Sequence, residues 1–259
     1  MQPKIFPAIR HERKQQPLLA QLGDLLLIEL SNWRWSWRMM VLTGIIAPLL
    51  GIISLSAFSH DRESLTYVLT GNVVLSLLFG NLEKVQTHFV FMRQVGTLDY
   101  FATLPIRRFV LILAVMLSFI LLSLPSVVVT ILFGSIFLGI PIAPNPLILL
   151  ILPLCAMPLA GVGAIIGTYA RTPEEAGSIS LLLTLSMLGL GPVIIPPDHL
   201  PQFLLLLGHL SPATYAASAL RQTLIGPITG QLLLDIAVLL GFSLISFWLA
   251  ARKMDWRQQ

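Results

Sequence analysis

The stretch "FVLILAVMLSFILLSLPSVVVTILFGSIFLGIPIAPNPLILLILPLCAMPLAGVGAIIGTYA" occupies residues 109–170 and contains no Asp, Glu, Lys or Arg. A helix crosses the hydrocarbon core of a bilayer in about 20 apolar residues, so this stretch is too long for a single crossing. Within it, "GIPIAPNP" (139–146) carries three prolines, which lack a backbone donor and stop a helix. The stretch therefore predicts two membrane-spanning helices, at 109–138 and 147–170.

The composition of the whole chain agrees with a membrane protein. Hydrophobic residues make up 56% of the chain and charged residues 11%, whereas a soluble domain has about 25% charged residues. Stretches with few or no charged residues elsewhere predict four more spans, at 39–60, 64–84, 176–196 and 230–251, the last with Asp235 near its start. We therefore expect an all-α integral membrane protein with six transmembrane helices, in which residues 1–259 form a single domain.

The distribution of positive charge predicts an orientation. If the N-terminus is cytoplasmic, all of the 16 Lys and Arg residues except Arg62 and Arg221 fall in cytoplasmic segments. Lys and Arg gather on the cytoplasmic side of membrane proteins, so we expect both termini there. The net charge of +4 then reflects this orientation, and no nucleic-acid partner is expected.

The residues before the first span have an amphipathic pattern. In 20–38, Trp33 and Trp37 share one face of a helix, and Arg34 and Arg38 share a neighbouring face. This pattern predicts an interfacial helix whose indole rings lie at headgroup level and whose guanidinium groups face lipid phosphates. The alternative is an aromatic belt at the mouth of the first span.

The chain lacks the usual catalytic motifs. It contains no Gly-Lys pair, which the phosphate-binding P-loop requires, so we expect no nucleotide hydrolysis in this chain. Its histidines lack the spacing of zinc ligands. The spans contain no pair of carboxylates for acid–base or metal chemistry on lipid headgroups. We therefore expect no catalytic, metal or cofactor site in this chain.

A short helix is predicted between the second and third spans, at 96–105. Gly96 can end the preceding helix at little steric cost, Thr97 can cap a new one, and Asp99 falls in its first turn. Leu104 precedes Pro105, which marks the end of the helix. An i, i+3, i+4, i+7 spacing gives the helix one apolar side, made of Leu98, Phe101, Ala102 and Pro105. This side either lies in lipid or docks into another protein.

Two segments resemble the type-2 permeases of ABC transporters. "GTLDYFATLPIRRFVLIL" (96–113) is similar to their cytoplasmic loop, and "LGHLSPATYAASALRQTLIG" (207–226) is similar to the region before their last span. The matching positions in the second segment are Ser211, Pro212, Tyr215, Ala219, Leu220, Arg221 and Gly226. The chain departs from the family pattern at 92–95, where "MRQV" replaces acidic residues.

The resemblance implies a membrane subunit in a bacterial-type plasma (inner) membrane. ATP and magnesium would bind two copies of a cytoplasmic ABC ATPase subunit, and a second permease copy or a homologous permease would complete the pathway. Coupling helices would receive the motion of the ATPase at 96–105 and 170–178. The implied coupling residues are Gly96, Thr97, Leu98, Asp99, Phe101, Leu104, Pro105, Glu174 and Glu175. The alternative for Glu174 and Glu175 is a solvated loop at a helix N-terminus, which favours acidic residues.

The resemblance also implies an outer re-entrant helical hairpin at 200–226 that closes the exit of the pathway. The favoured interpretation of Arg221 is that it reaches outer lipid phosphates, and the alternative is contact with substrate. Gly163 and Gly167 have the small-xxx-small spacing of close helix packing, within the chain or in a dimer. We expect an exporter of a hydrophobic or lipid-linked substrate. The alternatives are a membrane scaffold or assembly factor, and a lipid-modifying enzyme.

Overall fold

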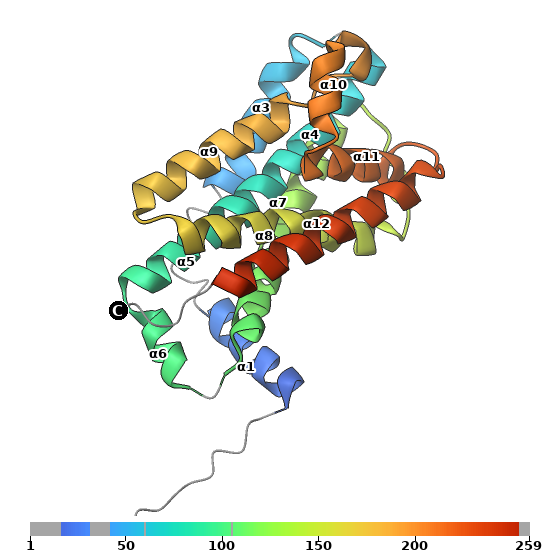
Figure 1. Cartoon of the computed structure of the whole chain (residues 1–259). Coiled ribbons are helices and arrows are strands. Elements are labelled where there is room, and N and C mark those ends of the chain that lie inside the picture. The colour runs from blue at the N-terminus through green and yellow to red at the C-terminus, as the bar shows by residue number, and fades with distance from the viewer. Residues whose placement is uncertain (1–16, 32–41, 60, 105, 254–259) are drawn as a thin grey trace, which may run out of the picture.

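The computed structural model describes residues 17–31, 42–59, 61–104 and 106–253, and every regular element in these ranges is a helix. In chain order they are α1 (Leu18–Ser31), η1 (Leu42–Ile46), α3 (Ala47–Ser56), α4 (Arg62–Leu77), η2 (Leu78–Glu83), α5 (Lys84–Gln94), α6 (Thr97–Thr103), α7 (Arg108–Leu138), α8 (Ile148–Tyr169), α9 (Pro173–Gly189), η3 (Pro197–His199), α10 (Gln202–Gly208), α11 (Pro212–Leu224) and α12 (Gln231–Lys253). The helices form an elongated bundle with α1 and α6 at one end and α10 at the other (Figure 1). We call these the α6 end and the hairpin end.

Four helices among the described residues are long and apolar enough to cross a membrane. They are Arg62–Gln94, Arg108–Leu138, Ile148–Tyr169 and Gln231–Arg252. The last three occupy the stretches expected at 109–138, 147–170 and 230–251. The first begins close to the expected start at 64 but continues past the expected end at 84, because α4, η2 and α5 form one unbroken helix.

The other two expected spans are shorter in the structure than in the prediction. The expected span at 39–60 contains an apolar helix over Thr43–Ser56, and the one at 176–196 contains α9, which has 17 residues. At about 1.5 Å per residue, α9 is roughly 26 Å long, less than the roughly 30 Å of a hydrocarbon core. It ends before Pro192, which has no backbone donor. The length of these two helices therefore does not establish six spans.

The connection between α7 and α8 lies where its prolines predicted it. α7 ends at Leu138, and Gly139 has φ +64°, a left-handed conformation that glycine adopts at little cost. The amides of Ala143 and Asn145 in this connection donate to the carbonyls of Leu224 and Thr223, at 2.9 Å each. The connection thereby satisfies carbonyls at the C-terminus of α11 and holds that helix in place.

The two glycines of α8 pack inside the chain. A Cβ at Gly167 would lie 2.7 Å from the Cβ of Phe89 and 2.8 Å from the carbonyl oxygen of Gln86, both on α5. A Cβ at Gly163 would lie 3.0 Å from the Cα of Leu82. Both contacts need glycine because backbone atoms cannot move aside cheaply. Of the two interpretations of this glycine pair, packing within one chain is confirmed.

The N-terminal helix α1 packs on the bundle with a side that carries both polar and apolar residues. Gln21, Leu25 and Glu29 are buried, and Glu29 Oε2 lies 2.9 Å from Nε2 of His88 on α5. Leu19 is 83% exposed and Leu27 67% exposed on other sides of the helix. The exposed apolar residues suit a lipid surface. The four residues that motivated the interfacial prediction, Trp33, Arg34, Trp37 and Arg38, lie outside the described residues.

Candidate functional site

The α6 end is built around a sharp bend at Gly96. α5 ends at Gln94, Gly96 has φ +75°, and α6 begins at Thr97. A left-handed φ is cheap for glycine and strained for other residues, which explains the break at this position. The prediction that Thr97 caps α6 is wrong. Gly96 occupies the N-cap position, and no side chain accepts a hydrogen bond from the first turn.

Part of the apolar side of α6 packs against the chain itself. Phe101 is 6% exposed, and it belongs to a buried cluster with Leu25 of α1 and Val110 of α7. Leu98 and Leu104 pack against the same cluster. Packing inside the chain thus buries Phe101, whereas Leu98 and Leu104 are only partly buried and Ala102 is exposed. Contact of this side with a partner protein or lipid stays a prediction. Pro105 lies outside the described residues.

A different set of side chains is exposed around the bend. Tyr100 is 62% exposed, Val95 61% and Phe91 57%, and Asp99 is also exposed. Phe91 lies on α5, Val95 is the C-cap residue one turn later, and Tyr100 lies on α6. We call Phe91, Val95 and Tyr100 the α6-end surface. The i, i+4 spacing of Phe91 and Val95 gave only a weak sequence signal, because α5 also carries the apolar residues Val85, Phe89, Val90 and Met92.

Arg93 joins the bend to the turn between α8 and α9. Its guanidinium donates to the carbonyl of Thr168 at 3.2 Å and also to the carbonyl of Ala170. Both carbonyls lie at the C-terminus of α8, where the helix dipole favours a positive charge. The structure thus gives Arg93 a role at the position where the sequence departs from the acidic pattern of the resembling family. The sequence analysis did not single out this residue.

The second expected coupling segment, 170–178, contains the N-terminus of α9. Thr172 is the N-cap residue, and its side chain accepts a hydrogen bond from the amide of Glu175 at 3.2 Å. The Glu175 carboxylate in turn accepts from the amide of Arg171 at 2.8 Å. This arrangement resembles a capping box, except that the carboxylate accepts from the residue before the N-cap, and it gives Glu175 a structural role at the helix start. Glu174 is exposed at the surface.

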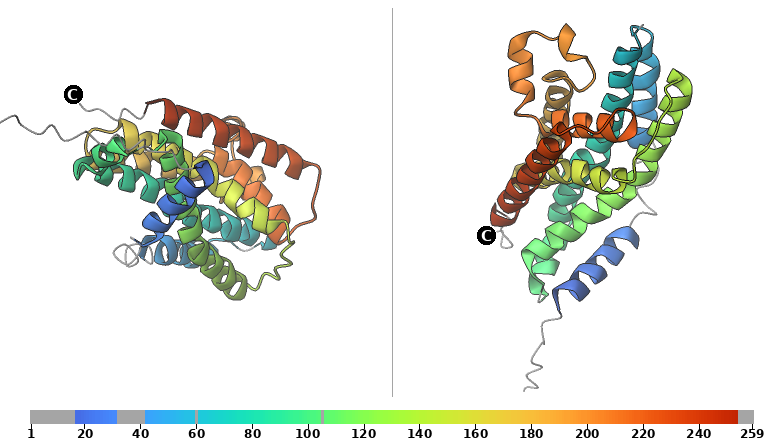
Figure 2. Two further views of the ribbon diagram at one scale, coloured as in Figure 1. Left: turned by 90° about the horizontal axis from the view of Figure 1, so that it is seen from below. Right: turned by 90° about the vertical axis from the view of Figure 1, so that its right-hand side faces the viewer.

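At the opposite end, α10 and α11 occupy the region where a re-entrant hairpin was expected, and they are bent by 89° relative to one another. Pro212 begins α11 after Ser211, and the Tyr215 hydroxyl donates to the carbonyl of His209 at 3.0 Å across the bend. α11 ends where the amide of Gly226 donates to the carbonyl of Arg221 at 3.0 Å. Figure 2 shows this hairpin and the α6 bend at opposite ends of the bundle.

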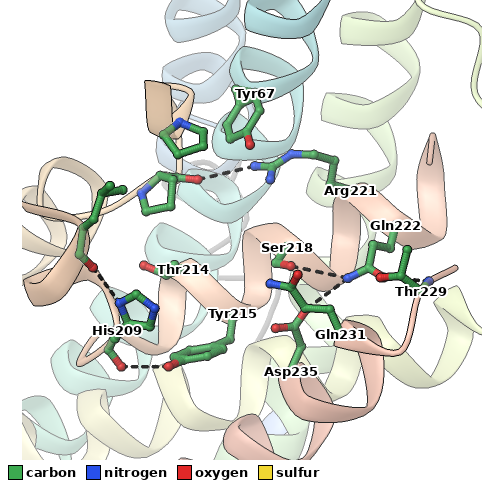
Figure 3. A pocket seen from close by; sticks show the side chains of 13 residues that line it. Tyr67, His209, Thr214, Tyr215, Ser218, Arg221, Gln222, Thr229, Gln231 and Asp235 are labelled. Carbon is green, nitrogen blue, oxygen red and sulfur yellow. Dashed lines mark hydrogen bonds between the residues drawn. The ribbon is translucent and has the colours of Figure 1, made fainter. Parts of the chain in front are cut away.

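A cavity of about 460 Å³ lies at the hairpin end. It is lined by α4, α10, α11, α12 and their connections, through Tyr67, Pro192, Pro197, Leu205, His209, Thr214, Tyr215, Ser218, Arg221, Gln222, Thr229, Gln231 and Asp235. Figure 3 shows that polar side chains from several helices converge here. We call it the hairpin cavity.

Arg221 lies inside this cavity. Its guanidinium carbon lies 3.5 Å from the centre of the Tyr67 ring, a cation–π contact. Its terminal nitrogen lies 3.4 Å from the Pro192 carbonyl and 3.5 Å from Oγ1 of Thr70. The side chain turns inward onto α4 (Figure 3). The favoured interpretation, that Arg221 reaches lipid phosphates beyond the hairpin, is therefore wrong.

An acidic residue faces the same cavity. Asp235 on α12 is fully buried, and one of its carboxylate oxygens accepts a hydrogen bond from the Gln222 side-chain amide at 3.1 Å. Gln222 is itself held by the amide and hydroxyl of Thr229, which donate to its side-chain oxygen at 3.1 and 2.8 Å. The sequence analysis did not single out Asp235, although it is the only acidic residue in the stretch 228–251.

The geometry at both ends can be compared with known proteins. A family model described as ABC-2 type transporter matches residues 21–225, which cover α1 to α11 and so include the bend, Arg93 and most of the hairpin cavity. A search of curated proteins finds no match. The family match covers most of the chain and agrees with its apolar helices. The chain belongs to the ABC-2 type transporter family and is a membrane component of an ABC transporter.

Proposed function

We propose that this chain is the transmembrane subunit of an ABC exporter that moves a hydrophobic or lipid-linked substrate by alternating access. A separate cytoplasmic ATPase subunit, in two copies, binds ATP and magnesium and drives the cycle. A second copy of this chain, or a homologous permease, completes the pathway. The absence of a Gly-Lys pair in the sequence supports a division of labour between the membrane and ATPase subunits.

The proposed topology has six spans with both termini in the cytoplasm. The α6 end would be cytoplasmic, because Arg93, Arg107, Arg108 and Arg171 gather there. Two further helices, α3 and α9, run alongside the four long ones and would complete the six (Figure 1). The membrane would be the plasma (inner) membrane of a bacterial-type cell, and the hairpin would close the exit of the pathway.

One observation carries the proposed contact with the ATPase. The α6-end surface exposes three large apolar side chains beyond the buried cluster of the bundle. Arg93 ties this region to the start of α9, so both cytoplasmic segments are held together. A force applied at the bend would therefore act on α5, α8 and α9 together. Aromatic residues such as Tyr100 are typical anchors of protein interfaces.

The proposal is tested by purifying the chain from its own cells in a mild detergent, with and without Tyr100→Ala. Truncation of an interface anchor weakens the binding free energy by about 2 kcal/mol or more, which is about a 30-fold loss of affinity. We expect an ATPase subunit to co-purify with the unchanged chain and to be depleted with Tyr100→Ala. Phe203→Ala is the matched control, because Phe203 is 61% exposed at the hairpin end and should keep the ATPase.

The competing functions predict other outcomes. A scaffold or assembly factor would co-purify with no ATPase at all, and it would retain its cellular function in the Tyr100→Ala variant. An ATPase that binds equally well to the chain and to both variants would place the contact elsewhere than the α6-end surface. Equal loss with both variants would point to misfolding, which the thermal unfolding midpoint of each purified variant detects.

A further inference from the structure

The hairpin cavity contains two oppositely charged side chains, Arg221 and Asp235, that do not contact one another directly. Within the described part of the chain, Arg221 Nε and Asp235 Oδ1 are buried and have no hydrogen-bond partner. Both residues belong to the described part of the chain, and no direct ion pair joins Arg221 to Asp235. A buried polar atom without a hydrogen-bond partner is costly, so each group favours a complementary ligand.

Each charge is held in place by its neighbours. The guanidinium of Arg221 rests on the ring of Tyr67, and its contacts with Pro192 and Thr70 are long, at 3.4 and 3.5 Å. The carboxylate of Asp235 is held by the amide of Gln222 at 3.1 Å. Fixed side chains lose little entropy when a ligand binds, which favours affinity.

The shape of the Arg221 guanidinium indicates which anion the hairpin cavity would bind. Arginine presents its donors in a planar fork that matches phosphate and carboxylate, and it binds phosphate well. The free oxygen of Asp235 accepts hydrogen bonds and would bind an ammonium group. A ligand with only one charge would leave the other group uncompensated. A ligand that carries both charges, with the anion toward Arg221 and the cation toward Asp235, would satisfy both.

We propose that the hairpin cavity binds a small phosphate–ammonium zwitterion, with the phosphate on Arg221 and the ammonium group on Asp235. This chemistry occurs both in aminophospholipid headgroups and in free phosphoethanolamine. The cavity volume of about 460 Å³ holds a group of this size. The inference concerns binding and does not depend on the proposed ATPase partner or on transport.

The test uses the full chain, purified in a maltoside detergent and washed free of lipid. Three probes are titrated by calorimetry: dihexanoyl phosphatidylethanolamine, dihexanoyl phosphatidylglycerol and free phosphoethanolamine. The first probe carries both charges on a lipid, the second carries only the negative charge, and the third carries both charges without acyl chains. Binding of phosphoethanolamine identifies a soluble ligand, and binding of the phosphatidylethanolamine alone identifies a lipid headgroup.

Two variants separate the two contacts. Arg221→Gln removes the phosphate partner and should weaken binding of every probe roughly 10- to 100-fold, as expected for a lost charge-assisted hydrogen bond. Asp235→Asn removes the ammonium partner and should weaken binding of the two ethanolamine probes by a similar factor. It should not weaken binding of phosphatidylglycerol, which has no ammonium group. Arg62→Gln and Asp198→Asn, at exposed charges of the hairpin end, are the matched controls.

A third variant tests the proposal even if Arg221→Gln or Asp235→Asn fails to fold. Ser218→Leu fills part of the cavity and keeps both charged residues, but it also removes the hydrogen bonds of Ser218 with Asp235 and Gln222. It should weaken binding of all bound probes, and its thermal unfolding midpoint shows whether the variant folds. No binding of either ethanolamine probe would overturn the proposal. Equal affinity for phosphatidylethanolamine and phosphatidylglycerol, unaffected by Asp235→Asn, would also overturn it.

Discussion

The link between the bend at Gly96 and the α8–α9 turn depends on Arg93, so Arg93→Gln should loosen that link. The guanidinium makes two charge-assisted hydrogen bonds to carbonyls of α8, and a hydrogen bond to a charged group contributes roughly 1.5–3 kcal/mol. Its position at the helix C-terminus adds about 0.3–1 kcal/mol. Because the side chain is partly exposed, we take about 2 kcal/mol for the whole contact.

The assay is hydrogen exchange of backbone amides, read by mass spectrometry on the purified chain. A loss of about 2 kcal/mol corresponds to a roughly 30-fold faster local opening. Peptides that cover residues 168–176 and 91–104 should therefore exchange faster in Arg93→Gln, whereas peptides of the hairpin end should not change. Arg107→Gln is the control, because Arg107 is an exposed cation at the same end. Equal exchange in the two variants would refute the link.

Three further changes have defined outcomes. Gly167→Ala should lower the stability of the chain by about 1–3 kcal/mol, because its Cβ would meet α5; Gly241→Ala, whose Cβ would meet nothing within 4 Å, should not. The thermal unfolding midpoint in detergent measures both, and an equal effect would contradict the packing. Thr172→Ala removes the N-cap of α9 and should cost about 1 kcal/mol, seen as faster amide exchange in the first turn of α9. Phe101→Ala should destabilise the chain by about 3–5 kcal/mol, whereas Tyr100→Ala, on the exposed side, should leave the unfolding midpoint close to that of the unchanged chain.

The sequence predicted those features that local chemistry determines. The prolines between 139 and 146 separate α7 from α8, and Gly96 adopts the left-handed conformation that ends one helix and starts the next. In both places the backbone preference of one or two residues is sufficient to end a helix. The absence of charge over long stretches likewise predicted the long apolar helices.

Features that depend on tertiary packing were not predictable in the same way. The spacing of Leu98 and Phe101 gave α6 an apolar side, but it contained no information on whether that side faces the chain or a partner. Arg221 has no neighbour in sequence that could indicate the ring of Tyr67 on α4. The absence of charged residues also did not show that α9 ends at Gly189, so the expected span at 176–196 extended too far.

The most direct test of the central claim, that the α6-end surface contacts a separate ATPase, is crosslinking in intact cells. The photoreactive amino acid benzoylphenylalanine replaces Tyr100, which is 62% exposed at the bend. The same amino acid at Phe203, 61% exposed at the hairpin end, is the control. After irradiation, the account predicts a crosslink from position 100 to a protein that carries a nucleotide-binding P-loop, and none to that protein from position 203. A crosslink from position 100 only to lipid, or to proteins without a P-loop, would contradict the account.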